Sequence, residues 1–473
     1  MGERPGLAEP AARRKAGRAR GRVRPGIMTA LCCGLDIGST NLKAVLADAS
    51  GRVRWAKAVA TPRIEADGAV ATSAEALLGA AETLILEGWR ATGAGAPLAA
   101  VATAGVGEDG LALTPDLVPA APALPWFDER ASAEAEELAA GSAASPRLGL
   151  AVDRFRTAAK WLWLARHRTE ASNKDALWVA LTDYPAIAWS GRPFMSETLA
   201  ARTAAYDVYR RAWDAPMLEA ARAPRLPATV AAGTVLGPLR PGPLRDAGAA
   251  DAETLVVAGG HDHPVAASYI RRFEPGAVID SMGTAEVVYG ESAAPARPRL
   301  DPRLAFSVPV LGGPGLACLG VLEFAATLAP YREGPHGDLV AAFLAGERPA
   351  GGASPGEAPD GAAPPVAALD RDRALAATAA AIAGLVRASA DLIGAIGATG
   401  DLYTTGGWSR SDAFLRLRAE AFARPIFRFD EDELTGAGAA LIAASGRAPL
   451  DPATLARPSL RRFDPPPRSE ARP

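Results

Sequence analysis

Two short apolar runs on either side of a polar glycine turn constrain the fold of this chain more than any other feature. Residues 31–37 predict a buried strand, residues 42–46 predict a second strand, and Gly-Ser-Thr-Asn at 38–41 forms the turn between them. Two strands joined by a polar glycine turn are typical of a β-hairpin. A helical pattern at 73–88 and a further apolar strand at 98–105 follow. The first half therefore alternates strands and helices, which indicates an α/β fold.

The second half alternates in the same way, and the length of the chain predicts two domains. We expect strands at 254–258, 277–280 and 402–404, and helices at 131–140, 158–168, 371–395 and 411–423. A chain of 473 residues is too long for one ordinary core. We assign an N-terminal domain to 28–252 and a C-terminal domain to 253–456, with a Gly-, Ala- and Pro-rich surface loop at 346–366. Residues 457–473 predict a tail that packs little.

Charge and hydropathy restrict the possible partners. The net charge is −2, so no basic footprint for nucleic acid exists outside the N-terminus. Residues 1–27 are rich in arginine and predict a disordered extension, with a basic binding arm as the alternative. No run of about 18 apolar residues predicts a membrane span. Neighbouring Cys32 and Cys33 suit a reduced compartment better than a disulfide framework, so we expect a cytoplasmic protein.

The turn of the first hairpin carries groups that can bind phosphate. Gly38 allows backbone N–H groups to approach an anion, and the hydroxyls of Ser39 and Thr40 add donors. Asp36 can hold Mg²⁺ through water, and Lys43 can neutralise a phosphoryl group. The alternative is an ordinary hairpin whose polar residues are merely solvated.

Asp262 lies at a predicted strand-to-helix junction, where a carboxylate can face a cleft. It follows the apolar run 254–258 and a Gly-Gly pair, and Pro264 predicts that a helix begins close by. The carboxylate can act as a general base, as a helix N-cap, or as a metal ligand together with His261 and His263. An extended backbone would place the two histidines on one face and Asp262 on the other, which disfavours the metal site.

Four further segments, in a fixed order, resemble a known family. Residues 155–164 match an aromatic-x-Ser/Thr-x-x-Lys-aromatic-x-Trp-aliphatic signature, and 126–130 match a Trp-x-Asp-x-Arg segment. Thr-Thr-Gly-Gly at 404–407 resembles an adenosine loop, and the small residues at 434–440 resemble the helix that closes a nucleotide site. Together with the first hairpin, they resemble the FGGY carbohydrate kinases of the actin, Hsp70 and sugar-kinase superfamily, such as the xylulose, glycerol and gluconate kinases.

The resemblance implies two ribonuclease H-like domains, each a mixed five-stranded sheet flanked by helices, with the active site in the cleft between them. It implies that Asp262 is the catalytic base and that Asp36 holds Mg²⁺. The ATP and phosphate contacts that it implies are Gly38, Ser39, Thr40, Asn41, Lys43, Gly283, Thr284, Gly320, Gly406, Gly407 and Ser411.

The sugar pocket is where this chain departs from its relatives. Glu108 and Asp109 stand where relatives usually carry Gln-Met-His or Gln-Arg-Glu, and a carboxylate there can accept hydrogen bonds from substrate hydroxyls. Trp126 and Phe155 match positions whose rings pack on the carbon chain of the substrate, with a plain core role as the alternative. His261 and His263 complete the predicted substrate contacts, whereas Lys160 and Arg130 are expected to form ion pairs that hold the domain together.

These features predict an enzyme that transfers phosphate from Mg²⁺-ATP to a hydroxyl of a small sugar or polyol. The alternatives are a non-catalytic sugar- or ATP-binding regulator on the same fold, and a metal-dependent hydrolase built on His261, Asp262 and His263. The resemblance makes a homodimer plausible, and nothing in the sequence selects the sugar, because one fold serves many substrates.

Overall fold

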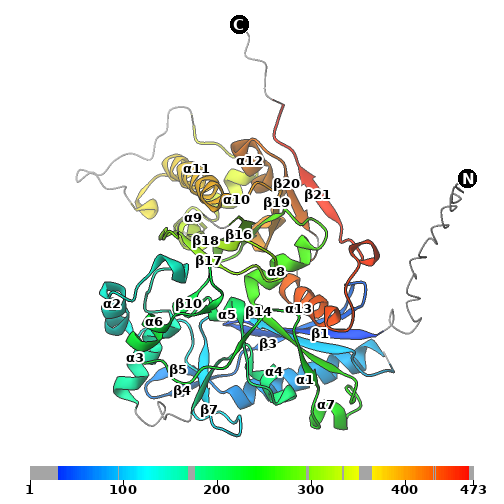
Figure 1. The fold of residues 1–473 in the computed structure, drawn as a ribbon. Helices are drawn as coiled ribbons and strands as arrows, with labels where there is room; N and C mark the ends of the chain where they lie inside the picture. Colours follow the sequence, from blue (N-terminus) through cyan, green and yellow to red (C-terminus); the bar gives the residue numbers. More distant parts are fainter. Residues whose placement is uncertain are drawn as a thin grey trace, which may run out of the picture.

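The computed structural model describes residues 30–93, 95–168, 176–293, 298–332, 335–350, 365–429, 431 and 433–467. Within these residues two large mixed sheets form the centres of two domains (Figure 1). The N-terminal half of the chain, blue to green, builds the lower domain in this view, and the yellow to red segments build most of the upper one. The predicted extension at 1–27 lies outside the described residues, as does most of the predicted loop at 346–366.

The first sheet has six described strands in the order β13-β14-β6-β1-β2-β3. Their bounds are Leu31–Ile37 for β1, Asn41–Asp48 for β2, Val53–Ala60 for β3, Ala100–Gly105 for β6, Val235–Pro238 for β13 and Leu255–His261 for β14. β1 and β2 form the predicted antiparallel hairpin, and β6 runs parallel to both β1 and β14. We placed β14 in the C-terminal domain, and that boundary at 252 is wrong, because β14 pairs with β6 inside the first sheet.

The second sheet has seven described strands in the order β17-β18-β16-β15-β19-β20-β21. Their bounds are Val278–Met282 for β15, Ala285–Ser292 for β16, Leu304–Ser307 for β17, Leu316–Glu323 for β18, Leu402–Thr405 for β19, Ile426–Phe429 for β20 and Leu460–Phe463 for β21. The expectation that the tail packs little is therefore wrong for β21, which pairs antiparallel with β20 and buries Phe463.

The two sheets repeat one five-stranded arrangement. In each, an antiparallel three-stranded meander is continued by two parallel strands, β3-β2-β1-β6-β14 in the first sheet and β18-β16-β15-β19-β20 in the second. The expected five strands are thus the common core, and β13, β17 and β21 extend the edges. The first strand-to-strand turn of each meander, at 38–40 and 283–284, faces the region between the domains where the candidate site lies.

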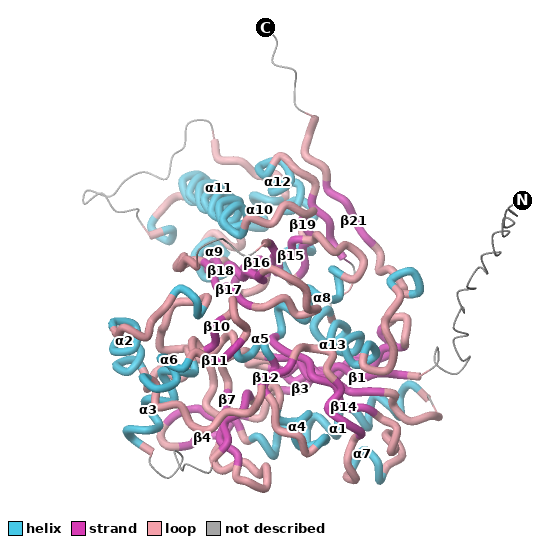
Figure 2. The backbone as a smooth tube through the Cα atoms, in the orientation of Figure 1, coloured by secondary structure: helices cyan, strands magenta, loops and turns pink. Residues whose placement is uncertain are grey.

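Helices cover the sheets (Figure 2). Their bounds are Ala74–Thr92 (α1), Ser132–Ala140 (α2), Thr157–His167 (α3), Tyr184–Ser190 (α4), Glu197–Ala200 (α5), Ala215–Ala220 (α6), Pro243–Asp246 (α7), Asp262–Arg271 (α8), Ala325–Arg332 (α9), Leu339–Leu344 (α10), Arg371–Ile396 (α11), Asp412–Phe422 (α12) and Leu434–Ser445 (α13). Four short strand pairs complete the described strands: β4 (Arg63–Ala66) with β5 (Ala69–Thr72), β7 (Gly110–Leu113) with β8 (Leu177–Ala180), β9 (Met195–Ser196) with β12 (Thr229–Val230), and β10 (Tyr206–Asp207) with β11 (Ala212–Trp213).

Local signals explain where the helices begin and end. The hydroxyl of Ser73 accepts a hydrogen bond from the Ala76 N–H at the start of α1, and Gly93 ends the helix at φ 59°. α11 is long and apolar enough to cross a membrane by length and composition alone. In the structure this helix packs against β16 and β18, so an apolar face that fits a lipid bilayer here covers a sheet.

Helix α13 joins the two halves of the chain. It comes late in the sequence, yet it packs on β1, β2, β6 and β14 of the first sheet and on α8 (Figure 1). Its small residues permit this close approach, since a Cβ at Gly34 of β1 would lie 2.0 Å from the Gly436 carbonyl oxygen. The pair α8 and α13 therefore lies between the sheets and brings the C-terminal half of the chain against the first hairpin.

Candidate active site

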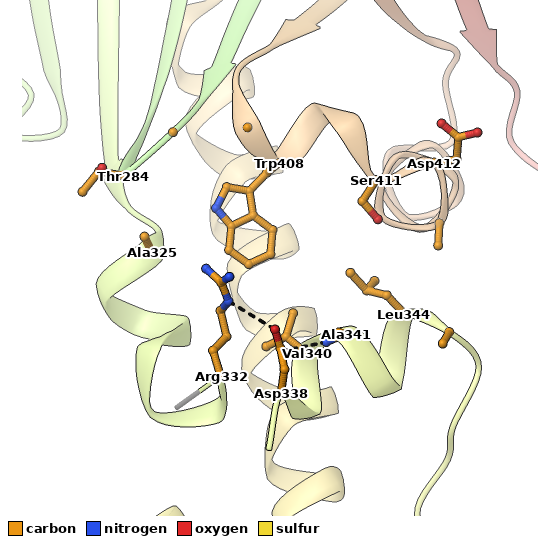
Figure 3. A pocket seen from close by; sticks show the side chains of 14 residues that line it. Thr284, Ala325, Arg332, Asp338, Val340, Ala341, Leu344, Trp408, Ser411 and Asp412 are labelled. Carbon is orange, nitrogen blue, oxygen red and sulfur yellow. Dashed lines mark hydrogen bonds and ion pairs between the residues drawn. The ribbon is translucent and has the colours of Figure 1, made fainter. Parts of the chain in front are cut away.

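Three adjoining cavities extend from the space between the two domains into the second domain. The N-side cavity, about 430 Å³, is lined mainly by the first domain and by residues 301–305. The central cavity, about 390 Å³, lies between the first hairpin and the start of α13. The C-side cavity, about 810 Å³, lies within the second domain (Figure 3). Asp262 and His263 line both the N-side and the central cavity, and Gly407 lines both the central and the C-side cavity. The N-side cavity therefore adjoins the central cavity at Asp262 and His263, and the central cavity adjoins the C-side cavity at Gly407.

Two glycines place Asp262 at this boundary. β14 runs so close to β6 that a Cβ at Gly259 would lie 1.9 Å from the Thr103 carbonyl oxygen. The pairing register of β14 with β6 shifts between Val257 and Gly260, which marks a bulge just before the catalytic segment. The N–H of His261 then donates to Thr198 Oγ1 at 2.9 Å, and α8 begins at Asp262. The strand-to-helix junction was predicted, with the helix beginning slightly earlier than Pro264 suggested.

The carboxylate of Asp262 is held by its two histidine neighbours. Its Oδ1 accepts a hydrogen bond from the His263 N–H at 2.6 Å and lies 3.2 Å from His261 Nε2. Burial, helped by the nearby Arg202, lowers the pKa of His261 well below its ordinary value, so this ring is neutral. In the described part of the chain, no group of three His, Cys, Asp or Glu side chains is arranged to hold a metal ion. Asp262 is also not the cap of α8, because His261 occupies that position.

The central cavity collects acidic groups around one lysine. Asp36, Lys43, Asp262 and Glu433 all line it. Burial raises the pKa of Asp36 to about 7, Asp262 and Glu433 raise it further, and Lys43 opposes the shift. Lys43 Nζ lies 2.9 Å from Glu433 Oε2, so the hairpin lysine is paired with the residue that precedes α13. Mg²⁺ keeps several of its own waters and needs only one or two carboxylates, so Asp36 fits the ion that the family implies as a single carboxylate at the cavity wall.

The remaining residues of the first turn divide between cavities and solvent. Gly38 lines the central cavity, as expected of a phosphate contact. Ser39 lines the N-side cavity instead, where its Oγ accepts a hydrogen bond from Trp126 Nε1 at 2.7 Å. Thr40 and Asn41 are exposed and are absent from the described lining of all three cavities. In this structure the phosphate role predicted for these three residues is therefore not supported.

The C-side cavity is formed by the second hairpin turn and by the segment after β19 (Figure 3). Gly283, Thr284, Gly407 and Ser411 line it, as predicted for nucleotide contacts. Gly406 lines the central cavity instead; its φ is 89°, and a Cβ there would lie 2.5 Å from the Met282 carbonyl oxygen. That close approach of backbone to backbone is what the Gly-Gly signal specifies.

Sequence reasoning missed the side chains that shape this cavity. The indole of Trp408 faces its space, and Arg332 lies beneath the ring at 5.4 Å from the centroid (Figure 3). Arg332 Nε is 3.6 Å from Asp338 Oδ2. Trp408 directly follows the Gly-Gly pair, and this position in the sequence could have indicated that its side chain lies near the nucleotide.

Gly320 is a packing residue in this structure, and its nucleotide contact stays a prediction. It lies within β18 between β16 and β17 and is absent from the described lining of the three cavities. A Cβ at this position would lie 2.5 Å from Leu392 Cδ1 of α11. The glycine therefore allows α11 to sit close to the sheet.

Glu108 lies in the N-side cavity and Asp109 does not. Arg156 and Arg202 hold Glu108 as a carboxylate, and these arginines, together with Lys160, keep its pKa below the ordinary value despite burial. Asp109 is absent from the described cavity linings; its Oδ1 accepts a hydrogen bond from the Trp126 N–H, and burial raises its pKa to about 6. Asp109 thus supports the wall of the cavity, and its substrate contact stays a prediction.

Aromatic rings and the two histidines complete the N-side cavity. Trp126 and Phe155 both line it, with ring centroids 5.5 Å apart, and His261 and His263 line it as predicted. Lys160 is buried behind it, where its Nζ donates to the carbonyl oxygens of Glu108 and Pro125 at 3.1 and 2.6 Å. Burial lowers the pKa of Lys160 to about 8. Lys160 therefore supports the cavity wall through backbone carbonyls rather than through the ion pair that we expected.

Comparisons with known proteins identify the class. Residues 31–268 match the N-terminal domain and residues 370–446 the C-terminal domain of the FGGY family of carbohydrate kinases. The chain belongs to this family, and it is a phosphotransferase that acts on a sugar hydroxyl. A comparison with curated proteins found no match.

Solved structures share the fold. A xylulose kinase from Rhodospirillum rubrum is 22% identical with a TM-score of 0.77, and a gluconate kinase from Lactobacillus acidophilus is 18% identical with a TM-score of 0.76. A Plasmodium falciparum glycerol kinase with ADP is 14% identical with a TM-score of 0.77. Each comparison covers 92% of this chain and 94% of the other. At these identities the likeness concerns the fold.

Proposed function

We propose that this chain transfers the γ-phosphoryl group of ATP to a hydroxyl of a small sugar or polyol bound in the N-side cavity. The observation that carries the proposal is the position of Asp262, which lines the N-side and the central cavity at once. A hydroxyl in the first and a phosphoryl group in the second would meet beside one carboxylate. The C-side cavity, with Thr284, Trp408 and Ser411, then accommodates the rest of the nucleotide.

In this mechanism Asp262 accepts the proton of the substrate hydroxyl. The oxygen forms a bond to the γ-phosphorus, and the bond from that phosphorus to the β–γ bridging oxygen breaks, with its electron pair leaving on ADP. Its neutral neighbour His261, 3.2 Å from Asp262 Oδ1, orients the carboxylate. The backbone around Gly38 and Gly406 allows close approach to the phosphates.

Charge in the central cavity is balanced by groups of both signs. Asp36 would hold Mg²⁺ through water, and the bound ion would neutralise phosphate charge. Lys43 is within the same cavity and is positioned to contact a phosphate oxygen if it leaves Glu433. Closing the domains over both substrates would exclude water, which otherwise competes with the sugar for the phosphoryl group.

The test is an ADP-release assay with a panel of sugars and polyols, followed by Asp262→Asn. We expect turnover of the variant to fall by about 10²–10⁴-fold, because the general base is lost, with unchanged melting temperature. Asp372→Asn is the matched control, since Asp372 also lies in the first turn of a helix, α11, and is exposed. Turnover within tenfold of wild type in Asp262→Asn would refute the proposed base. Sugar and ATP binding without ADP release by the wild type would favour the non-catalytic regulator.

A further inference from the structure

Two arginines of the N-side cavity converge on one oxygen of Glu108. Arg202 donates to Glu108 Oε1 from Nε at 2.9 Å and from Nη2 at 2.6 Å, and Arg156 donates to the same oxygen from Nη1 at 2.5 Å. The three side chains are largely buried, with exposed fractions of 9% for Glu108, 15% for Arg156 and 14% for Arg202. Glu108 Oε2 accepts no hydrogen bond from the described residues, so it remains an acceptor at the cavity.

Three separate parts of the chain build this arrangement. Glu108 follows β6, Arg156 precedes α3, and Arg202 follows α5. Gly107 makes room for the second arginine, because a Cβ there would lie 2.6 Å from Arg202 Cγ. Lys160 holds the backbone carbonyl of Glu108 at 3.1 Å. Hydrogen bonds therefore fix both the backbone and the side chain of Glu108, so its carboxylate is held in one position at the cavity wall.

A pair of arginines in a cavity is the arrangement that proteins use to bind a carboxylate or a phosphate. In this cavity the chain supplies that carboxylate itself. Arg156 is also paired with Asp153 at 2.9 Å. The other lining arginine, Arg303, donates to both oxygens of Asp301, at 3.1 and 2.8 Å.

The charge of the cavity follows from these pairs. Each arginine in its described lining has a carboxylate partner, and Asp262 adds a further negative charge. A substrate anion inside this space would face the carboxylates of Glu108 and Asp262, while each arginine of the described lining already has a carboxylate partner. Like charges brought together in this way are strongly unfavourable.

We propose that Glu108 is an internal counter-ion that restricts the N-side cavity to uncharged sugars and polyols and excludes sugar acids and sugar phosphates. Glu108 Oε2 accepts a substrate hydroxyl, while Oε1 keeps both arginines from a substrate anion. This inference rests on the proposed function and adds the charge class of the substrate. The inference predicts that the enzyme accepts uncharged polyols such as xylitol, and uncharged ketoses, but rejects aldonates with the same number of carbons.

The first arm of the test uses the wild-type enzyme and matched pairs, such as xylitol with xylonate and glucitol with gluconate. We expect kcat/KM for the uncharged member to exceed that for the acid by about 100-fold or more. Thermal stabilisation by each ligand, measured without ATP, gives the same comparison for binding alone. Preference for the acid would overturn the inference while leaving the kinase activity in place. Failure to release ADP with every sugar and polyol of the wider panel would instead overturn the proposed function, and the binding comparison would still decide the inference.

The second arm changes the charge. Glu108→Gln keeps the shape and an acceptor oxygen, but it takes the carboxylate partner from Arg202 and leaves Arg156 with Asp153 alone. We therefore expect the preference for the uncharged member to fall at least tenfold through a lower KM for the acid. The double variant Glu108→Gln, Arg202→Gln restores the charge balance and should recover the wild-type preference. Glu129→Gln is the control, because Glu129 is exposed, pairs with Arg154 and is absent from the cavity lining.

The same variants also show whether a cause other than the charge of Glu108 sets the preference for uncharged substrates. Equal selectivity in Glu108→Gln and wild type would overturn the inference. So would a double variant that accepts acids as well as the single variant does. If the single variant does not fold, the double variant is compared directly with the wild type, because it leaves one fewer buried cation without a partner. A preference for the acid in the double variant or in the wild type would refute the counter-ion role.

Discussion

Arg418 lies in a buried charge cluster of the second domain whose removal should be strongly destabilising. Its guanidinium is fully buried on α12, and Nη2 lies 2.8 Å from Asp280 Oδ2, 2.7 Å from Glu286 Oε1 and 2.7 Å from Ser389 Oγ. Both carboxylates are also fully buried. Burial raises the pKa of Asp280 well above its ordinary value, although Arg418 opposes the shift. The cluster contains one basic group, Arg418, and two acidic groups, Asp280 and Glu286.

Arg418→Met would leave two buried carboxyl groups without a cation. Breaking a buried pair in this way costs about 3–5 kcal/mol. At roughly 2–4 °C per kcal/mol for a domain of this size, the melting transition of the second domain should fall by about 6–20 °C. Thermal unfolding followed by circular dichroism measures this shift.

The cluster should also matter for the nucleotide. Asp280 lies in β15 and Glu286 in β16, on either side of the turn that lines the C-side cavity, and α12 begins beside Ser411. Arg418 therefore ties two walls of that cavity together. In Arg418→Met we expect KM for ATP to rise more than KM for the sugar, measured below the melting transition.

A triple variant separates charge from packing. Asp280→Asn and Glu286→Gln, added to Arg418→Met, remove the uncompensated acids, and replacing a whole buried ionic group is often close to neutral. Most of the lost stability should therefore return. A single variant that loses less than about 1 kcal/mol, or a triple variant no more stable than the single one, would show that this electrostatic reasoning is wrong.

Three further predictions concern other parts of the molecule. Burial raises the pKa of Asp183 from 3.8 to about 7, so this carboxyl group keeps its proton in the folded state over a pH range in which it is ionised in the unfolded state. The folded wild type therefore becomes less stable as pH rises from about 4 to 7. Thermal melts should show that Asp183→Asn gains stability over wild type across that window, by up to about 4 kcal/mol. Gly320→Ala should destabilise by about 1–3 kcal/mol through the clash with Leu392, while KM for ATP stays unchanged in the ADP-release assay. Trp408→Ala should raise KM for ATP by about tenfold with little effect on kcat, because a base would lose its aromatic wall; an unchanged KM would place the base elsewhere.

Local patterns in the sequence were sufficient where partners are close in the chain. The β1–β2 hairpin was predicted because its two strands and turn are contiguous and their apolar pattern is uninterrupted. The sheet to which β14 belongs was not predictable in this way, since its partner β6 lies far back in the chain and any buried strand has the same apolar pattern. β21 gave even less signal, because three of its four residues are exposed at a sheet edge and only Phe463 is buried.

The same distinction applies to the site. Asp262 and the glycine turns stand in recognisable local motifs, and the structure places Asp262 at the boundary of two cavities. Arg202 and Glu433 carry no such motif, and only the folded chain shows that one meets Glu108 and the other meets Lys43. Ser39 was assigned to phosphate from its motif, but it lines the N-side cavity and accepts a hydrogen bond from Trp126, a contact that no local pattern reveals.

The central cavity explains why neither half of the chain can form the site alone. Asp36 and Lys43 come from the first hairpin, and Glu433 comes from the residue that precedes α13. α13 covers β1 through the glycine contact at Gly34, so the packing that buries the first sheet also delivers Glu433 to Lys43. A change that loosens α13 from β1 would therefore alter the charge around the phosphates as well as stability. This coupling follows from the course of the chain, because the same helix both packs on the first sheet and begins at the wall of the cavity.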